Sequence, residues 1–300
     1  MSADARAGIA RELHRSARRR YTRRRVITKG LDDLHQMDFF EMIPYAHKSN
    51  GFKYMLTIID VYSKYAWAHP LKTKSGKEVA AVVRKVYNNS KRFPKHIQTD
   101  RGREFYNADF KKWTTSHNIN HYSTYSNMKA SVVERFNRTL RTRMWRAFTK
   151  QGSHAWIHLL PKLIHDYNHS YHRTIKMKPC DVHDNRLLST VYNTIKMVDT
   201  RKKKFKVGDM VRISKQKHLF EKGFLPNWST ELFTIDKVQL TNPVTYLLKD
   251  YQHQPVAGAF YAEELQKTKH PNVYLVERIL RRKENNVFVK WLGFDHSHNS

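Results

Sequence analysis

The chain has 300 residues, enough for one domain of roughly 150 to 200 residues and one or two smaller ones. Lysine and arginine number 56 against 26 acidic residues, a formal net charge of +30, so a polyanion is the expected partner. No apolar run approaches the roughly 18 residues needed to span a membrane, and the single cysteine, Cys180, excludes an intrachain disulfide or a zinc finger with two thiolates within these residues. We therefore expect a soluble, intracellular protein that makes no membrane contact.

Residues 1–30 carry ten basic and two acidic residues, with few apolar ones. Two runs stand out, Arg18 to Arg20 and Arg23, Arg24 and Arg25. We predict a basic arm over residues 1–30 whose arginines contact DNA phosphates. Such a run is also typical of a nuclear localisation signal, so a nuclear location is expected.

Residues 31–200 alternate strand and helix patterns and are predicted to form one domain with the order βββαβαβ, closed by two longer helices. Valines at helical spacing mark the first helix, and Ser49-Asn50-Gly51 marks the turn between the first two strands. The predicted strands cover residues 36–42, 54–62, 65–71, 96–100 and 119–124, and the predicted helices cover 77–89, 108–117, 131–150 and 155–171.

The C-terminal third has a different pattern. Residues 201–268 hold short strands without helices between them, which favours a small β-barrel, and the charge of the chain leads us to expect that it binds a polyanion such as DNA. Residues 269–300 hold two further strand-like runs, 273–280 and 286–291. The predicted organisation is thus a basic arm, an α/β domain, a small barrel and a short β segment.

Three acidic residues stand out by their context. Asp38 lies within an apolar strand, Asp100 ends another, and Glu134 lies on the helix that begins near Ser131. An acid in such a strand is costly to bury unless it is paired, hydrogen-bonded or metal-bound. In a sheet of the ribonuclease H type the first and fourth strands are central neighbours, which would place Asp38 beside Asp100.

Carboxylates placed in this way repel each other until a divalent cation joins them. Magnesium prefers oxygen ligands, and two ions can stabilise both the attacking and the leaving oxygen of an in-line displacement. The alternative is that each acid is ordinary: Glu134 a solvated helix residue, Asp100 a turn former before Gly102, and Asp38 a capped or paired strand residue.

The motifs around these acids resemble the core of retroviral-type DDE integrases. They are Thr99-Asp100-Arg101-Gly102-Arg103-Glu104-Phe105, Glu134-Arg135-Phe136-Asn137-Arg138-Thr139-Leu140, and Tyr171-His172-Arg173-Thr174-Ile175 with Lys178-Pro179. The spacings are similar too, with 61 residues between Asp38 and Asp100 and 33 between Asp100 and Glu134. The opening from Arg23 through Gly30-Leu31-Asp32 to Asp38 resembles integrases of Polinton/Maverick transposons in particular, with long-terminal-repeat retrotransposons as the alternative source.

The resemblance implies a ribonuclease H-like core with a mixed five-stranded sheet. It also implies an enzyme that processes the 3′ ends of element DNA with water and then joins the exposed 3′-hydroxyl to target DNA. Asp38, Asp100 and Glu134 would bind two Mg²⁺ ions per site, with Mn²⁺ as a substitute. Joining two double-stranded ends to one target implies a homo-oligomer, a dimer or tetramer.

Basic residues near the acids are the candidates for gripping the element end. Arg138 and Arg141 follow Glu134 by one and two helical turns, where similar integrases place basic residues, and Lys129 lies just before the helix. The alternative is a solvated basic face. His165, His169 and His172 have a spacing that could place them on one helical face and could in principle bind zinc, but neither an acid nor a thiol accompanies them.

Residues 274–280 and 289–294 resemble the first two thirds of a chromodomain. By that resemblance Tyr274, Trp291 and Phe294 would form a methyl-lysine cage for a histone tail, because aromatic faces attract a methylated ammonium. A role for these rings in the hydrophobic core is the alternative. The chromodomain pattern is incomplete at Ser300, and no His/Cys zinc module precedes Asp38, so the chain is expected to be a fragment or to come from an element without that module.

Two other functions remain open at this point. A domesticated DNA- or chromatin-binding protein could keep the fold without catalysis, and a ribonuclease acting on RNA–DNA hybrids shares the same fold. The acid on the late helix and the C-terminal segments favour integration.

Overall fold

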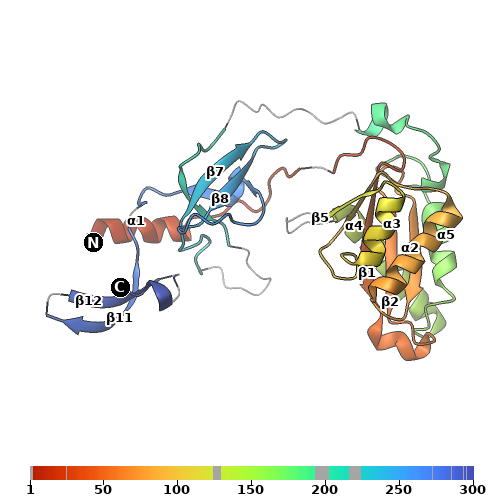
Figure 1. Cartoon of the computed structure of the whole chain (residues 1–300), viewed down its shortest axis with the longest axis horizontal. Coiled ribbons are helices and arrows are strands. Elements are labelled where there is room, and N and C mark those ends of the chain that lie inside the picture. Colours follow the sequence, from red (N-terminus) through yellow and green to blue (C-terminus); the bar gives the residue numbers. More distant parts are fainter. Residues whose placement is uncertain are drawn as a thin grey trace. The chain divides into compact units, whose positions relative to one another are not determined.

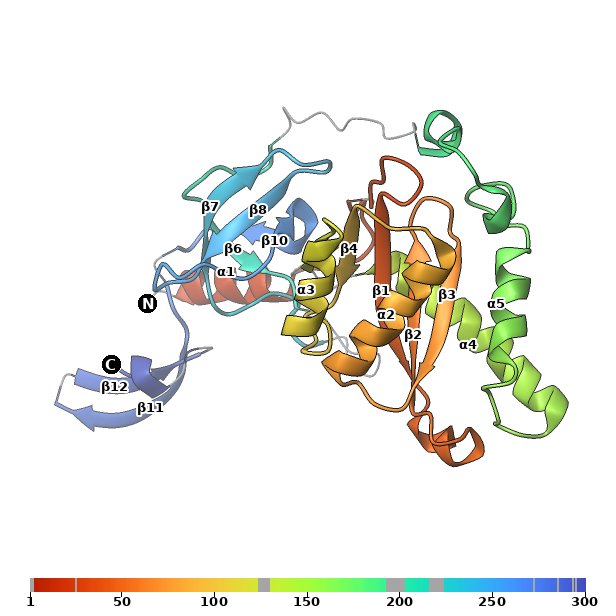
Figure 2. The ribbon, with the colours of Figure 1, turned by 45° about the vertical axis from the view of Figure 1, so that its right-hand side comes forward.

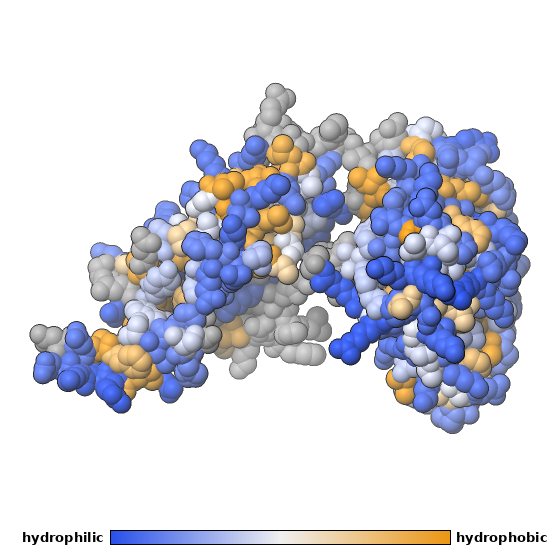
Figure 3. Space-filling view, in the orientation of Figure 1, coloured by the Kyte–Doolittle hydropathy of each residue, from blue (hydrophilic) through white to orange (hydrophobic). Residues whose placement is uncertain are grey.

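A computed structural model describes residues 3–24, 26–123, 130–192, 203–215, 224–271, 273–284, 286–292, 294 and 296–300. The chain forms two compact units, residues 26–195 and a second unit that combines residues 1–25 with residues 196–300 (Figure 1). Each unit has its own hydrophobic core. Hydrophilic side chains cover most of the face that Figure 3 shows, in keeping with the charge of +30.

The first unit is built on a five-stranded sheet with the order β3-β2-β1-β4-β5. Strands β1, β2 and β3 form an antiparallel meander, and β4 and β5 run parallel to β1. The strands are β1 (Leu34–Glu41), β2 (Tyr54–Asp60), β3 (Ala66–Leu71), β4 (His96–Thr99) and β5 (Asn120–Ser123). The predicted mixed five-stranded sheet is confirmed, and β1 and β4, the first and fourth strands, are neighbours in it as expected.

Helices cover both faces of this sheet (Figure 2). Helices α2 (Gly76–Ser90) and α3 (Ala108–Ser116) pack on the face that carries Met37, while α4 (Ser131–Gln151) and α5 (Leu160–Asn168) pack on the face that carries Phe40. Alternate residues of β1 point to opposite faces, so Gln36, Asp38 and Phe40 all face α4. The side of β1 that carries Asp38 is therefore the side that α4 covers.

The last helix of this unit is shorter than its pattern predicts. A helix is expected over residues 155–171, but α5 covers Leu160–Asn168. Pro161 lies in its first turn, where the missing N–H costs no hydrogen bond, and Trp156 before it is fully buried in the core. The chain therefore enters α5 through a turn that the buried Trp156 anchors.

The second unit is built on an antiparallel sheet with the order β10-β6-β7-β8-β9. Its strands are β6 (Met210–Ile213), β7 (Phe233–Gln239), β8 (Thr245–Lys249), β9 (Phe260–Tyr261) and β10 (Leu265–Lys267). Apolar residues such as Val211, Ile235 and Leu248 form its core. A separate hairpin follows, made of β11 (Val276–Lys283) and β12 (Asn286–Trp291).

The N-terminal segment differs from the predicted arm. Residues Ala3–His14 form helix α1, which buries Ile9 and Leu13 within the second unit. Further along, Arg19 donates to the carbonyl of Lys215 at 2.6 Å, and the backbone N–H of Arg24 donates to the hydroxyl of Tyr261 at 2.9 Å. Two apolar residues four apart on one helical face thus dock a segment too polar to form a core of its own, together with the hydrogen bonds that Glu12 accepts from Arg212 and Thr268.

In the described part of the chain, no helix is long and apolar enough to cross a membrane.

Candidate metal and DNA site

Asp38 lies on β1, and Asp100 directly follows the neighbouring strand β4. The parallel pairing of β1 with β4 aligns Gln36 with Gln98. Asp38 and Asp100 each follow by two residues, so both carboxylates belong to the same edge of the sheet. The backbone N–H of Gly102 donates to Oδ1 of Asp100 at 3.1 Å and orients that carboxylate in the turn after β4.

Glu134 lies in the first turn of α4, exposed to solvent. The pKa of Asp38 is raised to about 6, first by burial and also by the negative charges of Asp100 and Glu134, against hydrogen bonds from the Phe39 N–H and from Asn137 that lower it. Asp100 and Glu134 are therefore close enough to Asp38 for their negative charges to act on its carboxylate. The three acids that the sequence singles out do converge on one site.

Two hydrogen bonds fix the orientation of Asp38. The backbone N–H of Phe39 donates to Oδ1 at 2.8 Å, and the side-chain amide of Asn137 donates to Oδ2 at 2.9 Å. Asn137 is 8% exposed, and its own Oδ1 is buried with no hydrogen-bond partner among the described residues. Sequence reasoning missed Asn137 as a site residue, although its position three residues after Glu134 puts it on the neighbouring helical face.

A second missed residue, Gln36, holds the start of α4. Helix α4 has no side-chain cap at Ala130. Instead Oε1 of the buried Gln36 accepts from the backbone N–H groups of Val132 and Val133, both at 3.0 Å, and its amide donates to Gln98 at 3.0 Å. A strand residue thus caps the helix and ties Glu134 to the strands that carry Asp38 and Asp100.

The donor set suits a hard divalent cation. It offers carboxylate oxygens, which Mg²⁺ prefers, and one of them carries a raised pKa that a nearby cation would lower again. The ligand atoms of the three acids do not all lie within 4.8 Å of one another.

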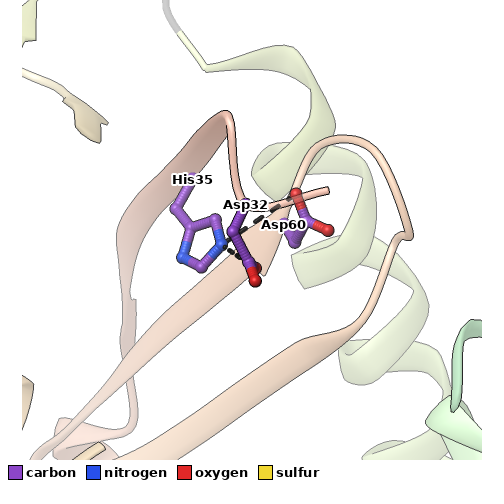
Figure 4. Close-up of side chains that lie close together, drawn as sticks. All are labelled: Asp32, His35 and Asp60. Atoms are coloured by element: carbon purple, nitrogen blue, oxygen red, sulfur yellow. Dashed lines mark hydrogen bonds and ion pairs between the residues drawn. The ribbon is translucent and has the colours of Figure 1, made fainter. Parts of the chain in front are cut away.

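Among the described residues, one group has all its ligand atoms within 4.8 Å: Asp32, His35 and Asp60. Figure 4 shows the imidazole of His35, from the start of β1, directed toward both carboxylates. Nε2 of His35 lies 3.0 Å from Oδ1 of Asp32 and 3.9 Å from Oδ1 of Asp60, while Nδ1 lies 2.9 Å from the hydroxyl of Tyr87.

A guanidinium already neutralises this group. Arg92 contacts Asp32 at 2.7 Å and Asp60 at 3.0 Å, and its guanidinium also lies over the rings of Tyr65 and Trp67. Burial alone would raise the pKa of Asp32, but the hydrogen bonds from His35 and Arg92 lower it. A metal ion would have to displace Arg92, so we interpret the group as a structural ion network beside a cleft of about 320 Å³.

The predicted DNA-binding residues fall into two sets. Arg138 and Arg141 are exposed on α4, on the helical line of Glu134, and the guanidinium of Arg141 lies 4.6 Å above the ring of Phe40. Arg23 and Arg24 are exposed in the second unit. Lys129 and Arg25 lie outside the described residues.

The histidine pattern does not form a shared helical face. Helix α5 ends at Asn168, so His172 lies beyond it and pairs with Met177 instead. His165 and His169 stack with ring centroids 3.9 Å apart. Within the described residues these histidines do not form a metal-binding group.

The three aromatic residues of the predicted cage do lie together. The ring of Tyr274 is 6.3 Å from that of Trp291 and 5.6 Å from that of Phe294, with interplanar angles of 69° and 78°. Tyr251, which sequence reasoning missed, stands at 69° to Phe294 with centroids 5.5 Å apart. The structure thus places the three predicted rings in one edge-to-face aromatic cluster.

A search of protein families gives a match over part of the first unit. Residues 31–126 match the integrase core domain. A transposon-derived protein of Caenorhabditis elegans is 34% identical over 192 residues, covering 64% of this chain and 65% of that protein. The Gag-Pol polyprotein of feline leukemia virus is 28% identical over 132 residues, covering 43% of this chain and 8% of the polyprotein.

The chain thus spans somewhat less than two thirds of the nematode protein and a small part of the viral polyprotein. Among solved structures, an intasome of simian T-cell lymphotropic virus, determined with the PP2A regulatory subunit B56 gamma, matches with a TM-score of 0.59 at 16% identity. The match covers 86% of this chain and 84% of that chain. The first unit has the ribonuclease H-like fold of integrase cores, and its homologues are retroviral and transposon-derived.

Proposed function

We propose that this chain is the DNA integrase of a mobile element, which processes 3′ ends and joins them to target DNA. The observation that carries the proposal is the convergence of Asp38, Asp100 and Glu134 at one edge of an integrase-type sheet. Partial similarity to a transposon-derived protein supports a mobile element as the source, and we retain a Polinton/Maverick type as the specific proposal.

In this proposal each residue has a definite task. Asp38, Asp100 and Glu134 hold two Mg²⁺ ions, which supply charge stabilisation for the attacking and leaving oxygens of the phosphodiester exchange. Asn137 and the N–H of Phe39 orient Asp38, and Gln36 sets the position of α4 and hence of Glu134. Arg138 and Arg141 on α4, Lys129 before it, and Arg23, Arg24 and Arg25 in the other unit neutralise DNA phosphates.

Two further proposals follow from the same reaction. Joining two DNA ends to one target requires at least two active protomers, so we propose a homodimer or homotetramer. The substrate is chromosomal DNA, so we propose a nuclear location, with the basic segment 18–25 as the signal.

The deciding experiment measures strand joining, and its reversal on branched DNA, with Mg²⁺ or Mn²⁺. We expect the wild type to be active and Glu134→Gln to lose activity by at least a hundredfold with unchanged DNA affinity, because only the metal-binding carboxylate is removed. Glu41→Gln, the same change at an exposed residue of β1, is the matched control. Equal trace activity in all three proteins would mean contamination and would leave a non-catalytic DNA- or chromatin-binding protein as the better interpretation.

The same assay separates the ribonuclease alternative. Cleavage of RNA–DNA hybrids in preference to duplex DNA, abolished by Glu134→Gln, would replace the integrase proposal with a ribonuclease H-type activity. Preference for branched or blunt duplex DNA would support integration.

A second candidate function rests on the perpendicular rings of Tyr274, Trp291 and Phe294. We propose that they bind a methylated lysine of a histone tail, with Tyr251 as a further wall. Titration with trimethyl-lysine and unmodified histone peptides tests this proposal. Trp291→Ala should abolish the preference for the methylated peptide, whereas Phe288→Ala, at an exposed ring on the same strand, should leave it intact. Equal affinity of the wild type for both peptides would refute it.

A further inference from the structure

The exposed face of α4 continues beyond the arginines predicted from the sequence. Arg141, Thr142, Trp145, Arg146 and Thr149 line a shallow groove of about 390 Å³. All five residues are exposed, and Trp145 retains 39% of its accessible surface. The exposed indole lies between two arginines, so this face presents an apolar ring and two cations side by side.

The ring of Trp145 is held in place from behind. It meets the ring of Tyr45 at 81° with centroids 6.0 Å apart, and that of the buried Phe148 at 5.3 Å. Tyr45 is itself stacked on His154 at 4.6 Å. The indole is therefore preorganised, and its remaining exposed surface requires little ordering when a flat partner binds.

The charges beside this ring are available to an anion. Among the described residues, neither Arg141 nor Arg146 has a carboxylate within 4.0 Å, and α4 carries one acidic residue, Glu134, against six basic ones. Glu134 and Trp145 are eleven residues apart, so they lie on nearly the same line of the helix, about 16 Å from each other. The groove thus continues the line that leads away from the carboxylates.

Interleaved aromatic and basic residues are the pattern that binds single-stranded nucleic acid, with bases on the rings and phosphates on the cations. A paired base is stacked on its neighbours and offers no free face, so the partner must be unpaired. Removal of nucleotides from a 3′ end leaves the complementary strand with an unpaired 5′ end, a few nucleotides from the reacting phosphodiester.

We propose that this groove binds the unpaired 5′ nucleotides of the processed DNA end, with a base stacked on Trp145 and phosphates on Arg141 and Arg146. The inference rests on the proposed integrase function and adds to it a binding site for the strand that does not react. It assigns Trp145 to the recognition of a base face without regard to its sequence, because every base offers such a face.

The test compares the affinity of the full chain for three DNA ends: blunt, with two unpaired 5′ nucleotides, and with the same overhang lacking its bases. We expect the wild type to bind the intact overhang on the order of tenfold more tightly than the other two. Trp145→Ala should lose this preference and Trp145→Phe should retain most of it. Tyr171→Ala, at a ring that is 68% exposed elsewhere in the same unit, should not change it.

Two accompanying measurements separate stacking from charge. Arg146→Ala should remove one phosphate contact and so reduce the slope of log affinity against log salt concentration by about 1. Trp145→Ala should leave that slope unchanged. The overhang should quench the indole fluorescence of the wild type, and it should quench the fluorescence of Trp145→Phe less.

If Trp145→Ala binds all three ends as the wild type does, or weakens all three equally, the groove is a solvated or structural face and the inference is overturned. Joining activity that depends on Glu134 would in that case still support the integrase proposal. If the wild type binds none of these ends, the integrase proposal fails and the groove inference fails with it.

Discussion

At the scale of single residues, Asp38 has the most demanding environment in the proposed site. It faces two other carboxylates and is partly buried, and it is held by Asn137 and by the N–H of Phe39. Its raised pKa shows that the folded protein carries an electrostatic cost there when no cation is bound. This electrostatic cost favours metal binding, because a cation that binds to the preformed cluster of carboxylate oxygens removes it.

The first prediction concerns this cost. Because the folded pKa of Asp38, about 6, lies above the ordinary 3.8, the ionised form opposes folding, so stability falls as pH rises from about 4 to about 6 and stays lower above that. We expect Asp38→Asn to raise the free energy of unfolding of the metal-free protein at pH 7 by about 1–2 kcal/mol, after allowance for solvent screening. Urea unfolding at pH 4 and pH 7 measures it.

Addition of Mg²⁺ supplies the control for that prediction. It should raise the melting temperature of the wild type and not that of Asp38→Asn, since a ligand stabilises the state that binds it. Loss of stability in Asp38→Asn at pH 7 would contradict the assignment of repelling carboxylates.

The second prediction concerns Arg92, which neutralises Asp32 and the fully buried Asp60. Arg92→Met should cost about 3–5 kcal/mol of stability, because it leaves buried carboxylates without a counter-charge. Arg84→Met, an exposed change on α2, should cost little. If Zn²⁺ or Mn²⁺ instead stabilises the wild type and Asp32→Asn abolishes that effect, the network is a metal site and our structural interpretation is wrong.

At the scale of elements, the geometry of the site depends on how α4 starts. A helix whose first residues lack a side-chain cap leaves backbone N–H groups without partners, and here Gln36 of β1 accepts from two of them. The bond serves two purposes, because it satisfies the helix end and sets the distance between Glu134 and the strand acids. The opposite end of α4 closes at Gly152, whose φ of 66° suits glycine.

The third prediction tests this role of Gln36. Gln36→Met keeps the side-chain volume and removes both hydrogen-bonding functions, so we expect a loss of about 1–3 kcal/mol in stability. Joining activity should fall much more than in Val83→Ala, a core truncation in α2 that also destabilises the fold. Equal activities at matched stability would mean that Gln36 has a purely structural role.

At the scale of the whole molecule, the two ends of the chain belong to one unit. Residues 1–25 pack with residues 196–300, although the entire first unit separates them in sequence. The contact centres on Glu12, which accepts from the buried Arg212 at 3.3 Å, from the hydroxyl of Thr268 at 2.9 Å and from the N–H of Lys269 at 2.7 Å. The second unit therefore cannot complete its fold until both ends have been made.

The fourth prediction follows from that contact. Glu12→Ala leaves Arg212, which is 2% exposed, without its counter-charge and should destabilise the second unit by about 3 kcal/mol. Asp4→Ala, at an exposed position of the same helix, is the control. Hydrogen exchange should lose protection in β6 and β10 and keep it in β1. Equal loss in both units would show that they do not unfold independently.

The local pattern of the sequence determined the strands, most helix bounds and the two central acids, because alternation and helical spacing depend on neighbouring residues alone. The pairing of Gln36 with Gln98, which sets Asp38 beside Asp100, joins strands distant in sequence and belongs to the tertiary structure.

Other features were decided by the tertiary structure: the cap by Gln36, the support of Asp38 by Asn137, the neutralisation of Asp60 by Arg92 and the docking of α1. Each of these contacts joins side chains from elements distant in sequence. Glutamine, asparagine and arginine are as common on a solvated surface as in a functional site. Only the fold brings such residues within hydrogen-bonding distance, so a pattern read along the chain cannot tell them apart.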